Sequence, residues 1–305
     1  MNAPPEPVAT RARVIIPFII VTLIWGSTWL VIKDQLGVVP ASWSIAYRFF
    51  AASLAMFLVV VLRRERLWLD ASGMAFAAVL GMMQFVLNFN FVYRAEGHVT
   101  SGLVSVVFAL MIVPNAILGR IFLKQRVGGT FFMASAIAIV GVALLFVQEA
   151  RGDSADPGET LMGVGLTFCA ILCASIANIM QGTERARRYP MLTVLAWGML
   201  IGSIADSALA WFMTGPPVWD ARPAYIGGVL YLGLIGSALA FPLYFSVIRA
   251  IGPAMAAYSG VLVPVIAMLL STIFEGYRWS TLAIFGAALT MTGLVIALRA
   301  RRPVR

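Results

Sequence analysis

Residues 148–160 read QEARGDSADPGET and form the longest polar stretch of the chain. Glycine, proline and acidic residues favour a solvated loop. On each side of this loop lie five runs of about twenty mostly apolar residues, and each run is long enough to cross a hydrocarbon layer of about 30 Å as a helix. We therefore predict an all-α integral membrane protein with ten transmembrane helices. The runs are Val14–Ile32, Ala41–Leu62, Ala71–Tyr93, Val99–Gly119, Gly128–Val147, Leu161–Gly182, Met191–Met213, Ala224–Ile248, Ala254–Phe274 and Ser280–Leu298.

Lysine and arginine are distributed unevenly between the loops. If the runs cross the membrane alternately, sixteen basic residues fall on one side and five on the other. Because cytoplasmic loops are enriched in Lys and Arg, we predict that both termini lie in the cytoplasm and that the protein resides in the inner (cytoplasmic) membrane. The larger set is Arg11, Arg13, Arg63, Arg64, Arg66, Arg120, Lys124, Arg126, Arg185, Arg187, Arg188, Arg249, Arg299, Arg301, Arg302 and Arg305, and the smaller set is Lys33, Arg94, Arg151, Arg222 and Arg278.

The composition excludes a water-soluble domain, since 61% of the residues are hydrophobic, 11% are charged and the mean hydropathy is +0.93. The net charge of +9 is placed beside helix ends. It therefore predicts contact with anionic membrane lipids and not with nucleic acid. The first run is too long for a signal peptide and is not followed by a small-residue cleavage site before Lys33. We expect it to be retained as a transmembrane helix.

An odd number of helices on each side of the central loop predicts that the second half enters the membrane in the opposite sense to the first. We therefore divide the chain into two five-helix repeats, 1–150 and 151–305, that form one transport unit. Inverted repeats commonly build secondary transporters, with the binding site near the midplane. Traces of a duplication are Arg94–Gly97 with Arg249–Gly252, Pro114 with Pro264, Arg126 with Arg278, and Gly141 with Gly293.

Several stretches resemble the drug/metabolite transporter superfamily, in particular its two-repeat, ten-helix EamA-type members. They are Trp25–Thr28, Arg48–Ala52, Pro264–Leu270, Glu275–Arg278, Gly286–Ala288 and Gly293. The family usually has a Glu directly before the Arg at the turn preceding the last helix of each repeat. Here Gly276 and Tyr277 separate Glu275 from Arg278, and Leu123 occupies the corresponding place in the first half. The resemblance implies export of small metabolites such as amino acids or drugs.

Two charged residues are predicted inside the membrane, where a charge costs at least about 2.5–3.5 kcal/mol on insertion scales. Arg48 and Asp206 each lie about 10 Å below the outer surface at 1.5 Å per residue. One hypothesis is that they neutralise each other across the two halves. Another is that Arg48 binds a substrate carboxylate. The alternative to both is that each side chain separately reaches water or a helix end.

Uncharged polar and aromatic side chains share helix faces in several runs, and these faces predict a substrate cavity that suits a small amphipathic molecule. Interhelical hydrogen bonding is the alternative explanation for the amides and hydroxyls. The predicted substrate-binding residues are Trp25, Thr28, Gln84, Asn88, Ser175, Asn178, Ser237, Tyr244 and Tyr258.

If proton antiport occurs, the candidate carriers near the outer side are Asp206, Glu275 and His98, which is predicted to begin the fourth helix. A hydrogen-bonded interfacial side chain is the alternative for His98. Pro114 and Pro264 lie at matching places in their runs. They are candidate hinges or passive kinks.

Small residues spaced seven apart, Ala134 with Gly141 and Gly286 with Gly293, predict close helix packing, with a dimer contact as the alternative. We expect a monomer or weak homodimer whose partners are a small-molecule substrate and membrane lipids.

Enzymatic and ATP-driven classes lack their signatures. There is no phosphate-binding loop of the G-x-x-x-x-G-K-[ST] form and no cluster of carboxylates or nucleophile–base pair for lipid chemistry. Cys169 and Cys173 suit small packing residues better than metal ligands, since His98 is the only histidine. We expect no cofactor, no metal and no enzymatic activity. An uncoupled uniporter or channel remains the alternative to a coupled transporter.

Overall fold

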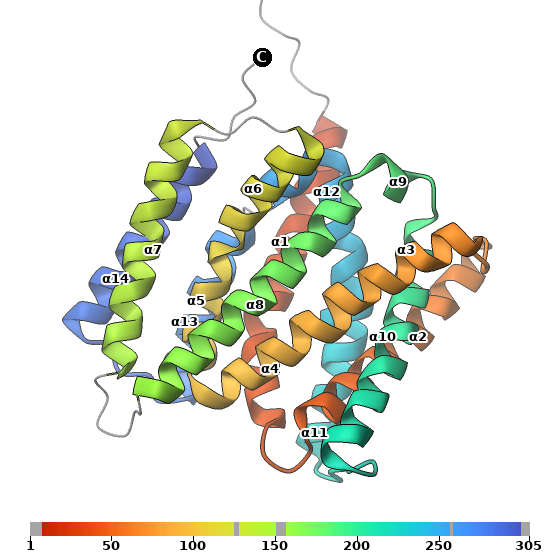
Figure 1. Ribbon diagram of the computed structural model, residues 1–305, viewed down its shortest axis with the longest axis horizontal. Helices are drawn as coiled ribbons and strands as arrows, with labels where there is room; N and C mark the ends of the chain where they lie inside the picture. Colours follow the sequence, from red (N-terminus) through yellow and green to blue (C-terminus); the bar gives the residue numbers. More distant parts are fainter. Residues whose placement is uncertain (1–7, 125–127, 151–156, 257–258, 300–305) are drawn as a thin grey trace, which may run out of the picture.

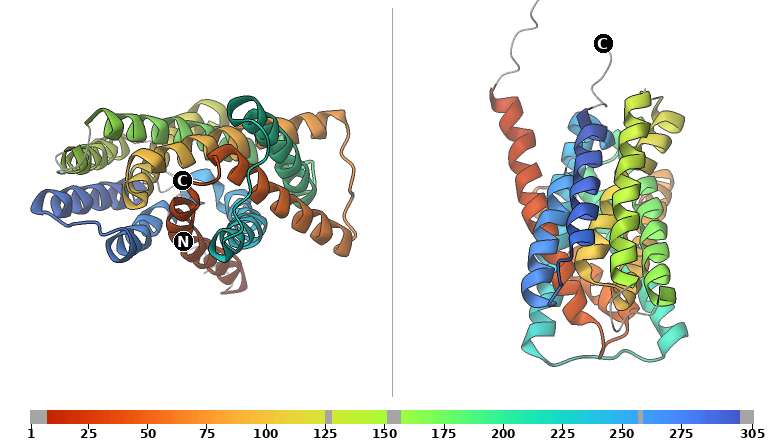
Figure 2. Two further views of the ribbon diagram at one scale, coloured as in Figure 1. Left: turned by 90° about the horizontal axis from the view of Figure 1, so that it is seen from below. Right: turned by 90° about the vertical axis from the view of Figure 1, so that its left-hand side faces the viewer.

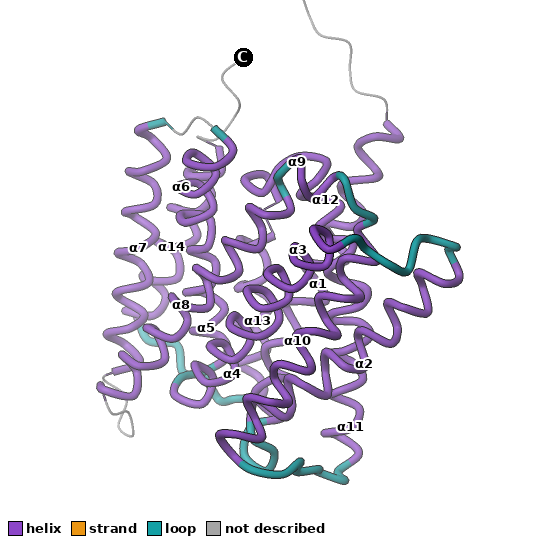
Figure 3. Tube along the Cα trace, turned by 45° about the vertical axis from the view of Figure 1, so that its right-hand side comes forward, coloured by secondary structure: helices purple, strands orange, loops and turns teal. Residues whose placement is uncertain are grey.

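A computed structural model describes residues 8–124, 128–150, 157–256 and 259–299, and every regular element in these residues is a helix (Figures 1 and 3). The elements in chain order are α1 Val8–Gln35, α2 Ala41–Leu62, α3 Ala71–Gly81, η1 Met82–Leu87, α4 Asn88–His98, α5 Ser101–Phe108, η2 Ala109–Met111, α6 Ile112–Leu123, α7 Gly129–Ala150, α8 Pro157–Gln181, α9 Glu184–Arg187, α10 Met191–Thr214, α11 Pro223–Leu230, η3 Tyr231–Leu239, α12 Ala240–Ala256, α13 Ser259–Phe274 and α14 Thr281–Arg299. Residues 151–156, the middle of the predicted central loop, lie outside the described residues.

Seven helical stretches of the described chain are long and apolar enough to cross a membrane. Three shorter apolar stretches fall where the fifth, ninth and tenth helices are predicted, at Gly129–Leu145, Val263–Phe274 and Thr281–Ile296. Large apolar side chains such as Leu62 and Phe212 point outward and are 72% and 87% exposed. Such faces are typical of helices in contact with lipid. The all-helical membrane class predicted from the sequence is confirmed.

The start of α1 and the end of α14 lie at the same end of the bundle (Figures 1 and 2). Helix α9 lies at this end, and α11 lies at the opposite end. We refer to the two ends as the α9 end and the α11 end.

The helix contacts follow a reciprocal pattern between the two halves of the chain. Helix α1 packs against α12 and α13, and α8 packs against α4, α5 and α6. Helix α2 packs along α10, and α7 packs along α14. Elements of both halves therefore meet in the middle of the bundle.

Helices α7 and α14 approach so closely that Gly141, Gly286 and Gly293, which lie between them, have no room for a side chain. A Cβ on Gly141 would lie 2.4 Å from the Thr290 backbone N, and one on Gly293 would lie 2.5 Å from the Ala138 backbone N. The close packing predicted from the small-residue spacing is confirmed. Without a hydrophobic driving force between helices in lipid, such backbone contact is a main source of association.

Gly293→Ala is expected to destabilise the protein by about 1–3 kcal/mol, because the added methyl group meets backbone atoms of α7 that cannot rotate away. The measurement is the thermal melting of purified protein in detergent. Gly165→Ala is the matched control, since a Cβ on Gly165 meets no atom within 4 Å. Equal melting temperatures for the two variants would contradict the packing described for α7 and α14.

The third predicted helix is longer than its apolar run. Its final segment, α4, continues to His98 and packs against α8 and α2. This packing buries polar residues that lower the local hydropathy, among them Glu96, which is fully buried. The prediction that His98 begins the fourth helix was therefore wrong, because His98 is the last residue of α4 and α5 begins at Ser101.

The eighth predicted helix ends in a break at Gly252, whose φ of 84° is left-handed, and Pro253 follows it. Only glycine adopts this conformation without strain. The break marks the turn toward α13 at the α9 end.

Candidate functional site

Two π-helical turns interrupt the third and eighth predicted helices near their middles. The Asn88 Nδ2, directly after η1, donates to the Gln84 carbonyl O of η1 over 3.2 Å. In η3 the Ser237 Oγ donates to the Leu232 carbonyl O over 2.8 Å. A π-turn widens the helix and is frequent at functional sites. Each turn carries a buried polar side chain, Gln84 in η1 and Ser237 in η3.

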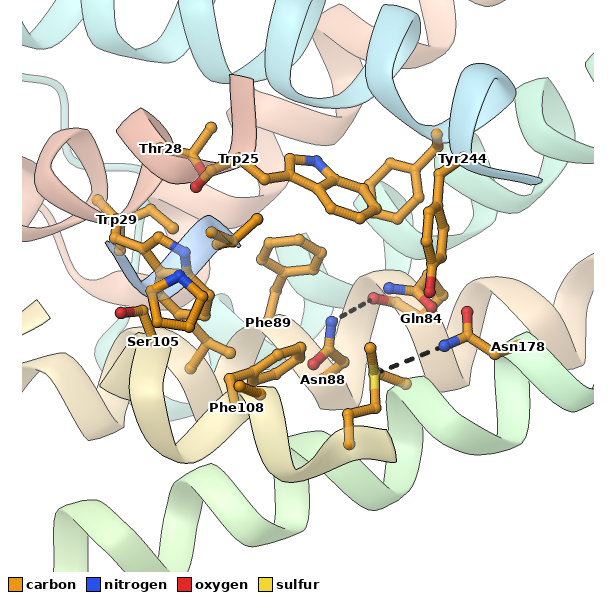
Figure 4. A pocket seen from close by; sticks show the side chains of 18 of the residues that line it. Trp25, Thr28, Trp29, Gln84, Asn88, Phe89, Ser105, Phe108, Asn178 and Tyr244 are labelled. Atoms are coloured by element: carbon orange, nitrogen blue, oxygen red, sulfur yellow. Dashed lines mark hydrogen bonds between the residues drawn. The ribbon is translucent and has the colours of Figure 1, made fainter. Parts of the chain in front are cut away.

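A cavity of about 90 Å³ lies between the two halves of the chain (Figure 4). This volume is enough for several water molecules. Figure 4 shows Trp25 and Thr28 of α1 on one side and Asn178 of α8 across from them. The lining residues are Trp25, Thr28, Trp29, Ile32, Arg48, Gln84, Asn88, Phe89, Val92, Ser105, Phe108, Ala109, Met111, Ile112, Ala174, Asn178, Phe241, Tyr244, Val263 and Pro264.

Most of the predicted substrate-binding residues line this cavity: Trp25, Thr28, Gln84, Asn88, Asn178 and Tyr244. Two others lie outside the lining. Ser175 is fully buried and its Oγ has no hydrogen-bond partner among the described residues, and Ser237 lies behind the cavity as a partner of Arg48. Tyr258 lies outside the described residues. The side chains that the structure brings together therefore come from α1, η1, α4, α8 and α12.

Arg48 of α2 is the one charged side chain in the lining. It is 1% exposed, its Nε donates to the Ser237 Oγ over 3.0 Å, and its Cζ lies 4.3 Å from the centroid of the Phe89 ring. The Nη1 atom has no hydrogen-bond partner among the described residues. The guanidinium is thus held from behind and from one face, with donor capacity left for a ligand.

Arg48 and Asp206 do not form the ion pair proposed from their similar depth. Among the described residues, the ion pairs join His98 with Glu159 and Asp220 with Arg222. Asp206 instead accepts a hydrogen bond at Oδ1 from the Asn90 Nδ2 over 2.7 Å. Two residues at the same depth meet only if their helices are rotated so that the side chains point toward each other. Arg48 and Asp206 point toward different partners, Ser237 and Asn90.

Asn90 connects three helices, because its Oδ1 also accepts a hydrogen bond from the Ser42 Oγ over 2.7 Å. The chain Ser42, Asn90 and Asp206 therefore joins α2, α4 and α10 away from the cavity. The sequence analysis did not single out Asn90, although its amide stands two residues from Asn88 in an otherwise aromatic stretch.

Acceptor atoms face the cavity from the amides. The Oε1 of Gln84 and the Oδ1 of Asn88 have no hydrogen-bond partner among the described residues. The Asn178 Nδ2 lies 3.5 Å from the Met111 sulfur. An unpaired buried polar atom is unfavourable unless water or a ligand bonds it, so these oxygens mark the places where a ligand can bind.

Aromatic rings form the remaining walls. The Trp25 and Tyr244 ring centroids lie 4.8 Å apart, and the Trp25 Nε1 donates to the Gly236 carbonyl O over 3.2 Å. The sequence analysis missed Trp29, Phe89, Phe108, Met111 and Phe241, which carry no polar signal inside an apolar run. Spacing alone marks two of them, since Trp29 follows Trp25 and Phe241 follows Ser237 by one helical turn.

Side-chain contacts bridge the bundle beyond the cavity at the α11 end. The Lys33 Nζ contacts the Glu96 carbonyl O and donates to the Val99 carbonyl O over 3.1 Å. The Ser101 Oγ donates to the Glu275 carboxylate, which joins α5 to the end of α13. His98 contacts Glu159 at the edge of α8. The predicted proton carriers His98 and Glu275 thus lie outside the cavity.

A second set of contacts bridges the α9 end. The Arg249 Nη2 donates over 3.0 Å to the Gln181 Oε1 and over 3.0 Å to the Ala186 carbonyl O. Helix α12 is thereby joined to α8 and α9. Polar contacts therefore join the helices at both ends of the bundle.

The two candidate hinges differ in their surroundings. Pro264 lines the cavity from α13. Pro114 lies in α6 beyond the lining and follows the 3₁₀ turn of η2. A proline cannot donate a hydrogen bond to the carbonyl four residues before it. For Pro114 this is the carbonyl of Leu110, which lies within the 3₁₀ turn of η2.

Asp220 and Arg222 fix the loop that precedes α11. The Arg222 backbone N–H donates to the Asp220 Oδ1 over 2.9 Å, and its Nε donates to the Oδ2 over 2.6 Å. The backbone hydrogen bond and the guanidinium lower the pKa of the Asp220 carboxyl from its usual value.

Asp206→Asn is expected to keep both thermal stability and transport, because the amide oxygen still accepts the Asn90 hydrogen bond. Asp206→Leu removes that acceptor and is expected to cost about 1–3 kcal/mol. Thermal melting and transport are measured on both variants. A well-folded Asp206→Asn protein that no longer transports would place this carboxylate in the coupling mechanism instead.

Similar proteins include a transporter family, individual bacterial relatives and a solved structure. Residues 12–147 and residues 161–299 each match the EamA-like transporter family. The protein PagO of Salmonella typhimurium is 24% identical over 291 residues, which cover 95% of this chain and 94% of PagO. The uncharacterized inner membrane transporter YedA of Escherichia coli is 27% identical over 297 residues, which cover 92% of this chain and 91% of YedA.

A solved crystal structure has the same fold, with a TM-score of 0.68 at 18% identity over 96% of this chain and 98% of its own. The two matched segments together span most of the chain and flank the central loop. The chain therefore belongs to the EamA-like transporter family, as its sequence motifs indicate.

Proposed function

We propose that the protein is a secondary transporter that exports small organic solutes, amino acids or related amphipathic molecules, through the central cavity. The observation that carries this proposal is the unpartnered Nη1 of Arg48 in a cavity that also presents unpartnered oxygens of Gln84 and Asn88. A guanidinium binds a carboxylate strongly, and amide oxygens accept hydrogen bonds from an ammonium group. This combination suits a zwitterion.

The apolar part of the cavity lining indicates that the substrate also has an apolar part. Trp25, Phe89, Phe108, Phe241 and Tyr244 surround the polar atoms with rings. Aromatic faces bury an apolar body at small conformational cost. An amino acid with an apolar side chain is therefore the substrate class that fits best.

We also propose that ten helices form two inverted five-helix repeats. Two family matches of similar extent support this arrangement, with one match on each side of the central loop. The reciprocal packing supports it too, since α1 with α12 and α13 mirrors α8 with α4, α5 and α6. In such folds the binding site lies where the repeats meet.

The contacts at the two ends suggest how access alternates. Opening the α11 end requires Lys33 to leave the carbonyls of Glu96 and Val99, whereas opening the α9 end requires Arg249 to leave Gln181. We assign the α9 end to the cytoplasm because the basic residues Arg185, Arg187 and Arg188 lie in and beside α9. Both termini then lie in the cytoplasm.

The test begins with a thermal-shift screen of purified protein against the standard amino acids and their small derivatives, since a ligand that binds only the folded state raises its stability. The amino acid that gives the largest shift is then used for counterflow in proteoliposomes, with and without a pH gradient. Exchange stimulated by the gradient supports coupled export, and exchange indifferent to it indicates a uniporter. A panel without any shift or exchange would contradict the proposed function.

A further inference from the structure

Glu96 is a buried carboxylate without hydrogen-bond partners. It lies in α4, its side chain is 0% exposed, and neither Oε1 nor Oε2 has a partner among the described residues. An ionised carboxylate in an apolar interior is strongly unfavourable unless hydrogen bonds or opposite charges compensate it. The protonated form avoids most of this cost.

Charges of both signs act on Glu96 from the helices around it. Lys33 of α1 and Arg48 of α2 attract its ionised form, while Glu275 at the end of α13 repels it. On α4 itself Tyr93 donates a hydrogen bond to the Gln35 Oε1 of α1 over 3.0 Å. Other ionisable groups on this segment and on the helices around it are Asp34 of α1, Arg94 and His98 of α4, Glu159 of α8 and, further away, Asp206 of α10. Asp34 also lines the second pocket described below.

The position of Glu96 places it between two hollow regions. The central cavity is lined by Val92, one helical turn before Glu96, and by Ile32, the neighbour of Lys33. A second, wider pocket of about 610 Å³ opens at the α11 end between α1, α11 and α13, and Lys33 and Glu275 both line it. Lys33 lines this pocket and its Nζ contacts the Glu96 carbonyl O, so it connects the pocket to the segment of α4 that carries Glu96.

We propose that Glu96 is a proton-binding site that links the α11-side solvent to the substrate cavity. A hydronium ion in the pocket gives its proton to the carboxylate, which leaves water and a neutral carboxylic acid. The neutral acid no longer attracts Lys33, the residue that bridges α1 to the end of α4 at this end. Proton uptake therefore favours opening toward the α11 side, and proton release favours closure.

The role of Glu96 in coupling rests on the proposed transport function, but its protonation is measurable without a substrate. The probe is the proton itself. Infrared difference spectra between acidic and alkaline pH are recorded on the purified full-length protein in lipid nanodiscs. A protonated carboxyl group gives a carbonyl stretching band that is separate from the bands of carboxylates and amides.

The band of the wild-type protein contains contributions from several carboxyl groups, among them the buried Asp206. Both proteins are therefore recorded in an Asp206→Asn background, and Glu96→Gln is expected to lose the component of the band that comes from Glu96. Glu159→Gln is the matched control, since Glu159 is 56% exposed and contacts His98 at the edge of the bundle, and it is expected to keep the band. An identical band in wild type and Glu96→Gln would overturn the proposal. If Glu96→Gln does not fold, Glu96→Asp replaces it: a shifted band supports the assignment, and an unshifted one contradicts it.

Transport then separates this proposal from the proposed function. Glu96→Gln is expected to retain counterflow of the amino acid found in the screen and to lose its stimulation by a pH gradient. Full stimulation in Glu96→Gln would show that another group carries the proton. Absence of counterflow in the wild-type protein would refute the transport function and leave the infrared result on Glu96 intact.

Discussion

Arg48→Gln is expected to lower counterflow at least about tenfold, a loss of about 1.4 kcal/mol in binding free energy, and to abolish the thermal shift given by the amino acid ligand. The glutamine lacks the charge that binds a carboxylate. The variant is expected to fold, because removing a buried charge also removes its desolvation cost.

Arg48→Lys is expected to rescue little of the lost transport. The Nε that bonds Ser237 and the flat face that lies on the Phe89 ring are both absent from lysine. Arg63→Gln, a change of an exposed arginine after α2, is the control for loss of charge as such. Normal transport by folded Arg48→Gln would show that the substrate does not bind the guanidinium.

Ala174→Phe is expected to abolish transport while leaving the melting temperature unchanged or higher. Ala174 of α8 lines the cavity, so the phenyl ring enters space that is already present. Filling a cavity with apolar atoms commonly stabilises a fold, and here the filling competes with the substrate. Activity and stability are thus predicted to change in opposite directions.

Leu172→Phe is the matched control on the same helix, because Leu172 is 52% exposed on the outer surface of the bundle. It is expected to keep both transport and stability. Transport by a folded Ala174→Phe protein at the wild-type rate would mean that the solute passes elsewhere. Loss of both activity and stability would mean that the cavity cannot accept the ring.

The membrane class and the course of most helices could be predicted from hydropathy, because lipid requires long apolar segments with internally bonded backbones. The same rule fails to predict the final part of the third helix, from Arg94 to His98. Polar residues such as Glu96 lower its hydropathy there, yet packing against α8 and α2 buries this side chain. A residue buried by protein need not be apolar. Hydropathy alone does not distinguish this case from a loop.

The amides and the arginine of the cavity lining were predictable, whereas Ser105 and most apolar members were not. Asn88, Asn178 and Arg48 stand out because polar groups are rare within apolar runs, and they do line the cavity. Trp29 and Phe108 look like ordinary membrane packing until the helices are placed. Partner choice also escaped prediction: Arg48 bonds Ser237 and Asp206 bonds Asn90, since helix rotation, not depth, decides which side chains meet.

The proposed transport function requires that the cavity between the two halves holds the transported solute. The most direct measurement is counterflow of the amino acid found by thermal shift, comparing wild type with the double variant Asn88→Leu and Asn178→Leu in proteoliposomes. These changes remove polar groups from opposite halves of the lining and leave its volume nearly unchanged. We predict rapid exchange by the wild type and almost none by a double variant of equal melting temperature. Wild-type exchange by that double variant would contradict the account.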